Sequence, residues 1–388
     1  MPILYLVYFL IVFFNSSKVF AYPEFIGYKY SSCLTCHFNG QGNGPLNDYG
    51  RALWASEIAG RAGSQNKTEE QLADESGFLG ANSKLPMWLR PGFKMRGLYV
   101  LTNPGGAATS NRTILMQADA SLAMLFGNEQ RFAFISSFGY APTPQRLKNN
   151  KGEAKKNFIS REHYFRIQAT DNLWLYLGLL DKTFGIRSNN HTAYSRAKTG
   201  IAQNDQAHSL IMHYIQPKWE LSVDAFGGNM MQDKSLRQTG FSTLYEYESQ
   251  EAFRTGFSYL SSKNDYVKQE RMAIHARLGL GYGSALLAEL GLINNTPVSD
   301  PKTKGYYIYT EAIQKVSRGY HWFVQGQSYK EDLNADFVDN VKLGTGLLMF
   351  PGGKYEVRVE AENTHQISTS ADVAPDVWSI MTQLHLSL

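Results

Sequence analysis

Apolar and polar residues alternate along most of this chain from about residue 90 onward. In 112–126 the even positions are mainly apolar, whereas the odd positions include Thr113, Gln117 and Asp119. A period of two is the spacing of side chains on a β-strand with one apolar and one polar face. The runs extend over about ten residues, the length of a membrane-crossing strand and about twice that of most sandwich strands. The same division recurs in 219–225, 272–280 and 355–361.

The links between these runs alternate in length. Short links, such as 127–129 and 216–217, alternate along the chain with long ones, such as 141–156 and 181–206. Short periplasmic turns and long outer loops are typical of outer-membrane β-barrels. We predict about sixteen strands, and an even number returns both ends of the barrel to the periplasmic side. The predicted strands lie near 90–101, 112–126, 130–140, 157–169, 173–180, 207–215, 218–228, 239–248, 252–262, 270–280, 284–293, 305–315, 320–329, 340–349, 355–364 and 376–388.

With this pattern, the region from about residue 88 to 388 resembles outer-membrane porins of the sixteen-stranded kind. Its last strand carries apolar residues at alternate positions, including Trp378, Ile380 and Leu384, similar to the C-terminal signal of such barrels. The strand ends in Leu388, where porins usually have an aromatic residue. The resemblance implies an outer-membrane location, contact with lipid, passage of small solutes if the pore is open, and assembly as a homotrimer.

The longest link, 181–206, would be the third outer loop of such a barrel. In the porins that the chain resembles, the third loop folds into the lumen and narrows the pore. If it does so here, the resemblance implies that Arg187, Arg196 and Lys198 face the pore. These positive charges would then give a weak preference for anions. A mobile, solvated outer loop is the alternative.

Composition and charge agree with a membrane barrel. The chain has 23 Tyr, 22 Phe, 6 Trp and 34 Gly, and its mean hydropathy is −0.33. No segment after the N-terminus approaches 18 consecutive apolar residues, which argues against transmembrane helices. The net charge of +4 is too small to indicate a nucleic-acid-binding protein.

Both cysteines of the chain lie in the sequence Cys33-Leu34-Thr35-Cys36-His37. This C-x-x-C-H spacing is the attachment motif of a c-type haem. The two thiols add across the vinyl groups of the porphyrin, and the adjoining histidine is held where it can bind the iron. We predict one haem c, anchored by Cys33 and Cys36, with His37 as the proximal iron ligand.

Two other uses of a cysteine pair fit this chain less well. A thioredoxin-like redox pair would need a βαβ setting, which the pattern of residues does not predict. A structural zinc site normally has four ligands, and the sequence has no second cysteine pair and no histidine near the motif. Haem attachment is therefore the favoured interpretation of the motif.

Haem is attached to such motifs outside the cytoplasm, so the motif implies export. Residues 3–14 form an unbroken apolar run, and Val19-Phe20-Ala21 resembles a signal-peptidase site. We predict a signal peptide over residues 1–21, although no Lys or Arg precedes the apolar run. An uncleaved membrane anchor is the alternative.

The N-terminal segment, residues 22–86, links the predicted signal peptide to the barrel. Helical spacing predicts one short helix in 46–58 and a second one opened by Thr68, with Gln71 three residues later as in a capping box. The glycine-rich stretch 40–45 lacks the Lys-Ser/Thr of a phosphate-binding loop and predicts a flexible turn beside the haem. We expect a small, mostly helical, periplasmic haem module.

The sixth ligand of the iron has several candidates. Met87 is the first methionine after the haem motif. His385 lies on the polar face of the last strand, near the periplasmic rim of the predicted barrel. Alternatively the position stays open, which would allow small ligands or peroxide to bind.

The sequence thus predicts an all-β, transmembrane antiparallel barrel over 87–388, with a periplasmic haem module over 22–86. The favoured function is electron transfer at the periplasmic mouth of the barrel, with periplasmic or outer-surface cytochromes as partners. A passive porin with the haem module as plug, sensor or scaffold is the second reading. A peroxidase-like enzyme is the third, and the sequence favours an electron carrier or porin over an enzyme.

Overall fold

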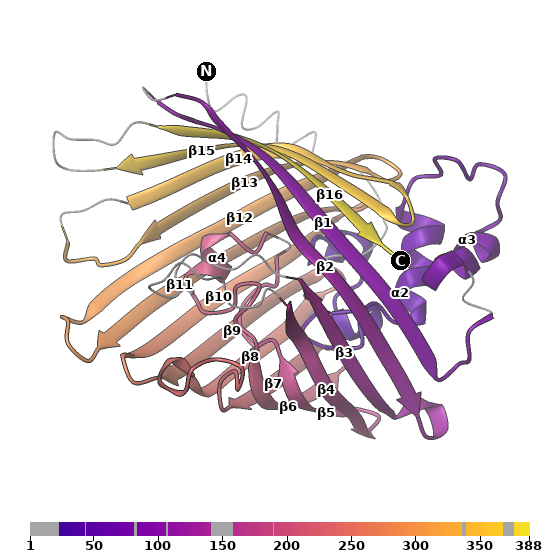
Figure 1. Ribbon diagram of the computed structural model, residues 1–388, viewed down its shortest axis with the longest axis horizontal. Coiled ribbons are helices and arrows are strands. Elements are labelled where there is room, and N and C mark those ends of the chain that lie inside the picture. Colours follow the sequence, from indigo (N-terminus) through magenta and orange to yellow (C-terminus); the bar gives the residue numbers. More distant parts are fainter. Residues whose placement is uncertain are drawn as a thin grey trace.

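The strands of this protein close into one barrel, with helices at one end (Figure 1). The computed structural model describes residues 23–42, 44–80, 84–105, 108–140, 158–188, 190–335, 339–367 and 376–388. The predicted signal peptide, 1–21, lies outside the described residues. Among the residues described, no helix is long and apolar enough to cross a membrane.

Sixteen strands form the barrel, and each is antiparallel to its neighbours in the chain. The first strand pairs with the last, Arg96 opposite His385, so the sheet has no free edge. This confirms the predicted fold class and strand number. The strands are β1 Leu89–Pro104, β2 Ser110–Phe126, β3 Phe132–Tyr140, β4 Phe158–Thr170, β5 Leu173–Leu180, β6 Ala207–Gln216, β7 Trp219–Phe226, β8 Thr239–Gln250, β9 Phe253–Lys263, β10 Val267–Gly281, β11 Ser284–Pro297, β12 Thr303–Ser317, β13 Tyr320–Lys330, β14 Asp339–Gly352, β15 Tyr355–Ile367 and β16 Val377–Ser387.

The two faces of the wall differ as the alternating pattern predicts. On β10, Ile274 is 58% exposed on the outside, whereas His275 and Arg277 are buried inside. An apolar outer face suits contact with lipid, and the enclosed polar side chains satisfy one another. The His275 imidazole, for example, lies 2.8 Å from a Glu246 carboxylate oxygen.

A β-bulge changes the predicted faces of β2. The pairing of β1 with β2 shifts between Arg96 and Gly97. Because an extra residue reverses the alternation, Leu115 is 44% exposed on the outside while Met116 lines an internal cavity. The sequence pattern predicted that Met116 faces lipid, and that prediction is wrong.

The long link 181–206 folds into the barrel, where its short helix α4 (Tyr194–Ala197) lies (Figure 1). Its backbone N–H groups donate to inward-facing side chains: Gly185 N to Ser258 Oγ at 2.9 Å, and Tyr194 N to Gln327 Oε1 at 2.8 Å. The inward fold of the predicted third loop is therefore confirmed.

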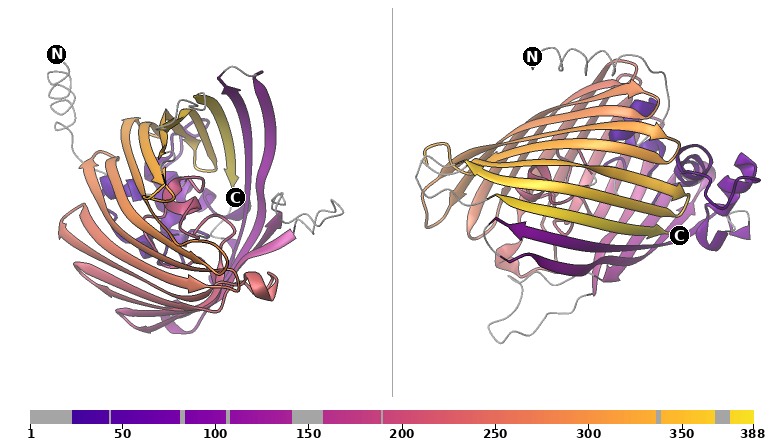
Figure 2. Two further views of the ribbon diagram at one scale, coloured as in Figure 1. Left: turned by 90° about the vertical axis from the view of Figure 1, so that its left-hand side faces the viewer. Right: turned by 90° about the horizontal axis from the view of Figure 1, so that it is seen from above.

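The helices of the N-terminal segment lie at the end of the barrel that carries the short turns and the C-terminus (Figure 2). Thr68 caps α3 in the predicted capping box with Gln71. The predicted helix in 46–58 is α2 followed by one π-helical turn, η3. The helices are η1 Pro23–Tyr28, η2 Cys33–Thr35, α2 Asp48–Leu53, η3 Trp54–Ile58, α3 Glu69–Glu75 and η4 Phe78–Gly80, with η6 Asn128–Gln130 and η8 Lys234–Leu236 in the barrel links.

Candidate haem site

The N-terminal segment is seated on the short turns of the barrel. A Cβ on Gly27 would come within 2.1 Å of the Ser284 carbonyl oxygen, in the β10–β11 turn, so only glycine allows this approach. Further along, Gly60 N donates to Phe350 O at 2.7 Å. Apolar side chains of both parts, including Ile26 and Phe350, form one buried cluster. The segment is therefore held against the barrel mouth.

Two arginines of the barrel wall hold the chain just before the haem motif. Arg254 Nη1 and Arg277 Nη2 donate to the carbonyl oxygen of Ser31, at 3.3 and 3.1 Å. Both guanidinium groups also bond the buried carboxylate of Glu246. The alternation in 272–280 predicts that Arg277 is on the polar face of its strand, but it does not predict this anchoring contact, because the pairing joins residues far apart in the chain.

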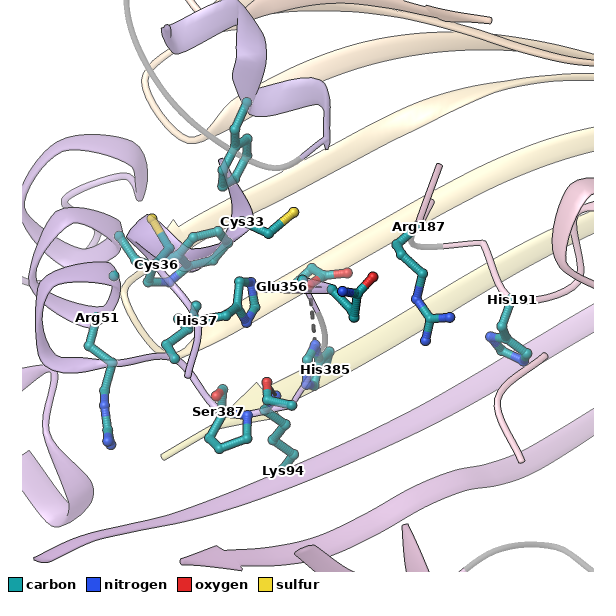
Figure 3. A pocket seen from close by; sticks show the side chains of 18 of the residues that line it. Cys33, Cys36, His37, Arg51, Lys94, Arg187, His191, Glu356, His385 and Ser387 are labelled. Atoms are coloured by element: carbon teal, nitrogen blue, oxygen red, sulfur yellow. Dashed lines mark hydrogen bonds and ion pairs between the residues drawn. The ribbon is translucent and has the colours of Figure 1, made fainter. Parts of the chain in front are cut away.

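The haem motif itself forms one tight turn. Cys36 N and His37 N donate to the carbonyl oxygen of Cys33, at 3.2 and 3.0 Å. Cys33, Cys36 and His37 all line one cavity (Figure 3). The donor set that a c-type haem requires is thus assembled in one place.

Asn47 holds this turn from the other side. Its Nδ2 atom donates to the carbonyl oxygens of Thr35 and Leu34, at 3.1 and 3.4 Å. Its Oδ1 atom accepts from Gly50 N at 2.8 Å and so caps α2. Asn47 was missed by sequence reasoning. The only signal was a favourable N-cap residue at the start of the predicted helix.

This cavity of about 330 Å³ lies between the N-terminal segment, the barrel wall and the loop 181–206. Two glycines shape its edge: a Cβ on Gly42 would come within 2.7 Å of Cys33 Sγ, and one on Gly50 within 2.3 Å of Cys36 O. The stretch predicted as a flexible turn thus packs closely beside the first cysteine. The side chains of the motif and the close backbone packing beside it are compatible with a covalently attached haem.

Cys33 and Cys36 form no disulfide bond. Burial raises the pKa of the Cys33 thiol to about 11 and that of Cys36 to about 12. They are therefore protonated at neutral pH, unlike the activated thiolate of a thioredoxin-like site. In the described part of the chain, no three or more His, Cys, Asp or Glu residues are grouped to hold a metal ion.

The lining of the cavity is more cationic than acidic. Haem carries two anionic propionates, which such a lining suits. Lys94 Nζ donates to the Gly44 carbonyl oxygen at 2.8 Å, and this hydrogen bond holds the Lys94 amino group beside the motif. The cationic members are Arg51, Lys94, Arg96, Arg187, Arg277, Lys354 and Arg358, and the acidic ones are Glu220, Glu246, Glu356 and Glu360.

The two candidates for the sixth ligand lie in different surroundings. Met87 is 76% exposed and is not among the residues that line the cavity. His385 lines the cavity, and its Nδ1 atom lies 3.2 Å from Glu356 Oε2 (Figure 3). Two methionines that the sequence did not suggest as iron ligands, Met116 and Met381, also line the cavity.

The three cations predicted to face a pore are engaged within the lumen. Arg187 lines the cavity and forms an ion pair with Asp181. Arg196 is buried and donates to the carbonyl oxygens of Ser188 and Ile201. The Lys198 ammonium lies 4.4 Å from the centre of the Tyr329 ring. Their effect on ion selectivity remains a prediction.

No known protein family matches the sequence, and no curated protein does so either. Solved structures of outer-membrane proteins do match the fold. OmpT of Vibrio cholerae shares 8% identity over 77% of this chain and 97% of its own, with a TM-score of 0.58. An anion-selective porin from Comamonas acidovorans shares 9% over 77% and 99%, with a TM-score of 0.58. OmpF of Salmonella typhi shares 15% over 77% and 97%, with a TM-score of 0.58. At these identities the likeness shows that the chain has the barrel fold of porins.

Proposed function

We propose that this protein is an outer-membrane β-barrel that carries one covalently attached haem c in its periplasmic mouth and exchanges single electrons there. The observation that supports this most is the cavity shared by Cys33, Cys36 and His37 with the inner barrel wall. The porin-like fold and the apolar outer face support the membrane location. Assembly as a homotrimer belongs to the proposal, since one structure of OmpT is a trimer form.

Each residue of the motif would have a defined part. The Sγ–H bonds of Cys33 and Cys36 would add across the two vinyl groups, so that one S–C bond forms per cysteine and the hydrogen goes to the neighbouring vinyl carbon. The His37 imidazole would bind the iron, held by the turn that its own N–H closes onto Cys33. The bound haem supplies an iron that gains or loses one electron between the ferric and ferrous states.

The position of the motif limits what one haem can do. It lies at the short-turn end, and the apolar band of a membrane barrel is about 25 Å tall. The loop 181–206 occupies part of the remaining lumen. A c-type cytochrome on either side of the membrane is therefore the class of partner that would deliver or collect the electron.

A passive solute channel is the second candidate. The solved structures that share the fold include an anion-selective porin and the outer-membrane channel DcaP of Acinetobacter baumannii. The N-terminal segment and the inward loop both narrow the lumen here. Conductance of the purified protein in planar bilayers separates the two functions: a large, constitutive pore would support solute passage over electron transfer.

Covalent attachment gives the direct test. The protein should be expressed in a periplasm with haem-maturation machinery, then denatured and extracted with acid acetone. We expect the red colour to stay with the polypeptide. The double variant Cys33→Ser, Cys36→Ser should lose the colour completely while the barrel keeps its heat-modifiable mobility on gels. Haem that is fully extracted from the native protein, or absent from it, would refute the proposal.

A further inference from the structure

The last strand points one row of side chains at the cavity. Gln383, His385 and Ser387 line it, whereas Leu384 is exposed on the outer wall. His385 lies opposite Glu356 of β15 in the strand register. Because both neighbouring strands belong to the closed wall, the height of this imidazole at the short-turn mouth is fixed.

The two nitrogens of His385 are in different situations. Nδ1 lies 3.2 Å from Glu356 Oε2, so the carboxylate accepts its hydrogen and leaves Nε2 as the nitrogen with a lone pair. Nε2 is buried and has no hydrogen-bond partner. A histidine whose second nitrogen is held by a carboxylate is the usual arrangement of a metal ligand in proteins.

The other histidines at the cavity are less suitable. His213 Nε2 is bonded to Glu220 at 3.0 Å, and its Nδ1 atom would lie 2.2 Å from a Cβ on Gly40, so backbone covers it. His191 belongs to the loop 181–206 and lies beyond Arg187 as seen from the haem motif (Figure 3). His385, by contrast, is three residues from the C-terminus, which lies at the end of the barrel where the N-terminal helices are (Figure 2).

The methionines that line the cavity are also less suitable than His385 as an iron ligand. Met381 is four residues before His385 on β16, which at about 3.3 Å per residue is about 13 Å farther from the short-turn mouth. Met116 faces the cavity from β2, two strands away from β16. A thioether also has no N–H group through which a neighbour could orient it.

We propose that His385 Nε2 is the second axial ligand of the haem that His37 binds, with Glu356 as the positioning residue that holds the imidazole. This inference rests on the proposed covalent haem. Coordination from both sides would tie the last strand of the barrel to the N-terminal segment. The iron would be six-coordinate and low-spin, and small ligands would bind only after displacing His385.

The test compares His385→Ala with the wild-type holoprotein by optical and electron paramagnetic resonance spectroscopy. We expect the variant to lose the low-spin signal, to gain a high-spin signal and to bind carbon monoxide in the ferrous state much more tightly. Added imidazole should restore the low-spin spectrum. Haem content by pyridine haemochrome and gel mobility of the folded barrel should stay unchanged.

A matched control is available at the other end of the barrel. His365 on β15 also pairs through Nδ1 with a carboxylate, that of Asp376, and its side chain is 44% exposed. His365→Ala should leave the spectrum as in the wild type. Unchanged spectra in His385→Ala, or loss of the low-spin signal in Met116→Leu or Met381→Leu, would overturn this inference while leaving the covalent haem standing. Absence of haem from the wild type would instead overturn the proposed function.

The test of Glu356 measures the midpoint potential of the haem, which a purely structural role of this residue would leave unchanged. Glu356→Gln keeps a hydrogen-bond acceptor but removes the charge, which makes the imidazole a weaker electron donor to iron. We expect the low-spin spectrum to persist and the midpoint potential to rise. An unchanged potential in this variant would contradict the positioning role.

Discussion

Two segments fill the lumen of this barrel from opposite ends, and they are held in different ways. The loop 181–206 enters from the long-loop end, and its backbone donates to side chains of the wall, as Ile186 N does to the buried Glu289 carboxylate. The N-terminal segment enters from the short-turn end, and its backbone lies directly against the backbone of the wall, with Gly27 beside Ser284 and Gly60 N bonded to Phe350 O.

This difference predicts which kind of amino-acid substitution each segment tolerates. Hydrogen bonds to enclosed carboxylates depend on the identity of one polar partner, because an unsatisfied buried group is costly. Close packing of backbone on backbone depends on size alone, because interiors have little free volume. The loop should therefore respond to charge changes at the wall, and the N-terminal segment to added methyl groups.

The largest effect is expected from Gly27→Val. Its Cβ would lie within 2.1 Å of a backbone oxygen, and overpacking of this kind costs about 1–3 kcal/mol. The segment should open more often, so trypsin should cleave after Lys29 on the order of tenfold faster. Limited proteolysis of the purified protein measures this rate.

Gly227→Val is the matched control for that variant, because a Cβ on Gly227 meets nothing within 4 Å. It should be cleaved at the wild-type rate. Equal protection of the Gly27 and Gly227 variants would show that the short-turn contact does not hold the segment.

An intermediate effect is expected from Glu289→Ala. The change removes the acceptor of two buried donors, Ile186 N and the Tyr307 hydroxyl, at a cost of about 1–3 kcal/mol. The loop 181–206 should leave its place more often, and single-channel recordings should show a larger, noisier conductance. Glu270→Ala removes only a partly exposed pair with Lys268 and should leave the recordings unchanged. Identical traces for both variants would contradict the role of Glu289.

The smallest effect is expected from two variants of Asn47. Asn47→Ala removes the helix cap and the three donated bonds to the haem motif, and loss of the cap alone costs about 1 kcal/mol. Asn47→Asp keeps an acceptor for Gly50 N and loses only the donors. Haem per polypeptide should fall in both, more in the alanine variant. A full haem yield in both would mean that the motif does not need this side chain.

Much of the wall could be predicted from the sequence because its strands depend on the local alternation of apolar and polar residues. A period of two decides which side chains of a strand share a face, as for Ile274 and His275, and the alternating link lengths give the strand number. The C-x-x-C-H spacing is equally local, since one turn of backbone brings Cys33, Cys36 and His37 to the same place. Neither inference needed to know which distant residues meet.

The rest was decided by tertiary structure. A bulge turns Met116 inward, and barrel closure sets Arg96 beside His385, neither of which a single strand specifies. Met87 and His385 could not be ranked from spacing, because the 347 residues between His37 and His385 return to the same mouth only when the sheet closes. Sequence therefore determined the strands and the attachment motif. The closed barrel decided what faces that motif, because contacts between distant residues depend on register and closure rather than on local periodicity.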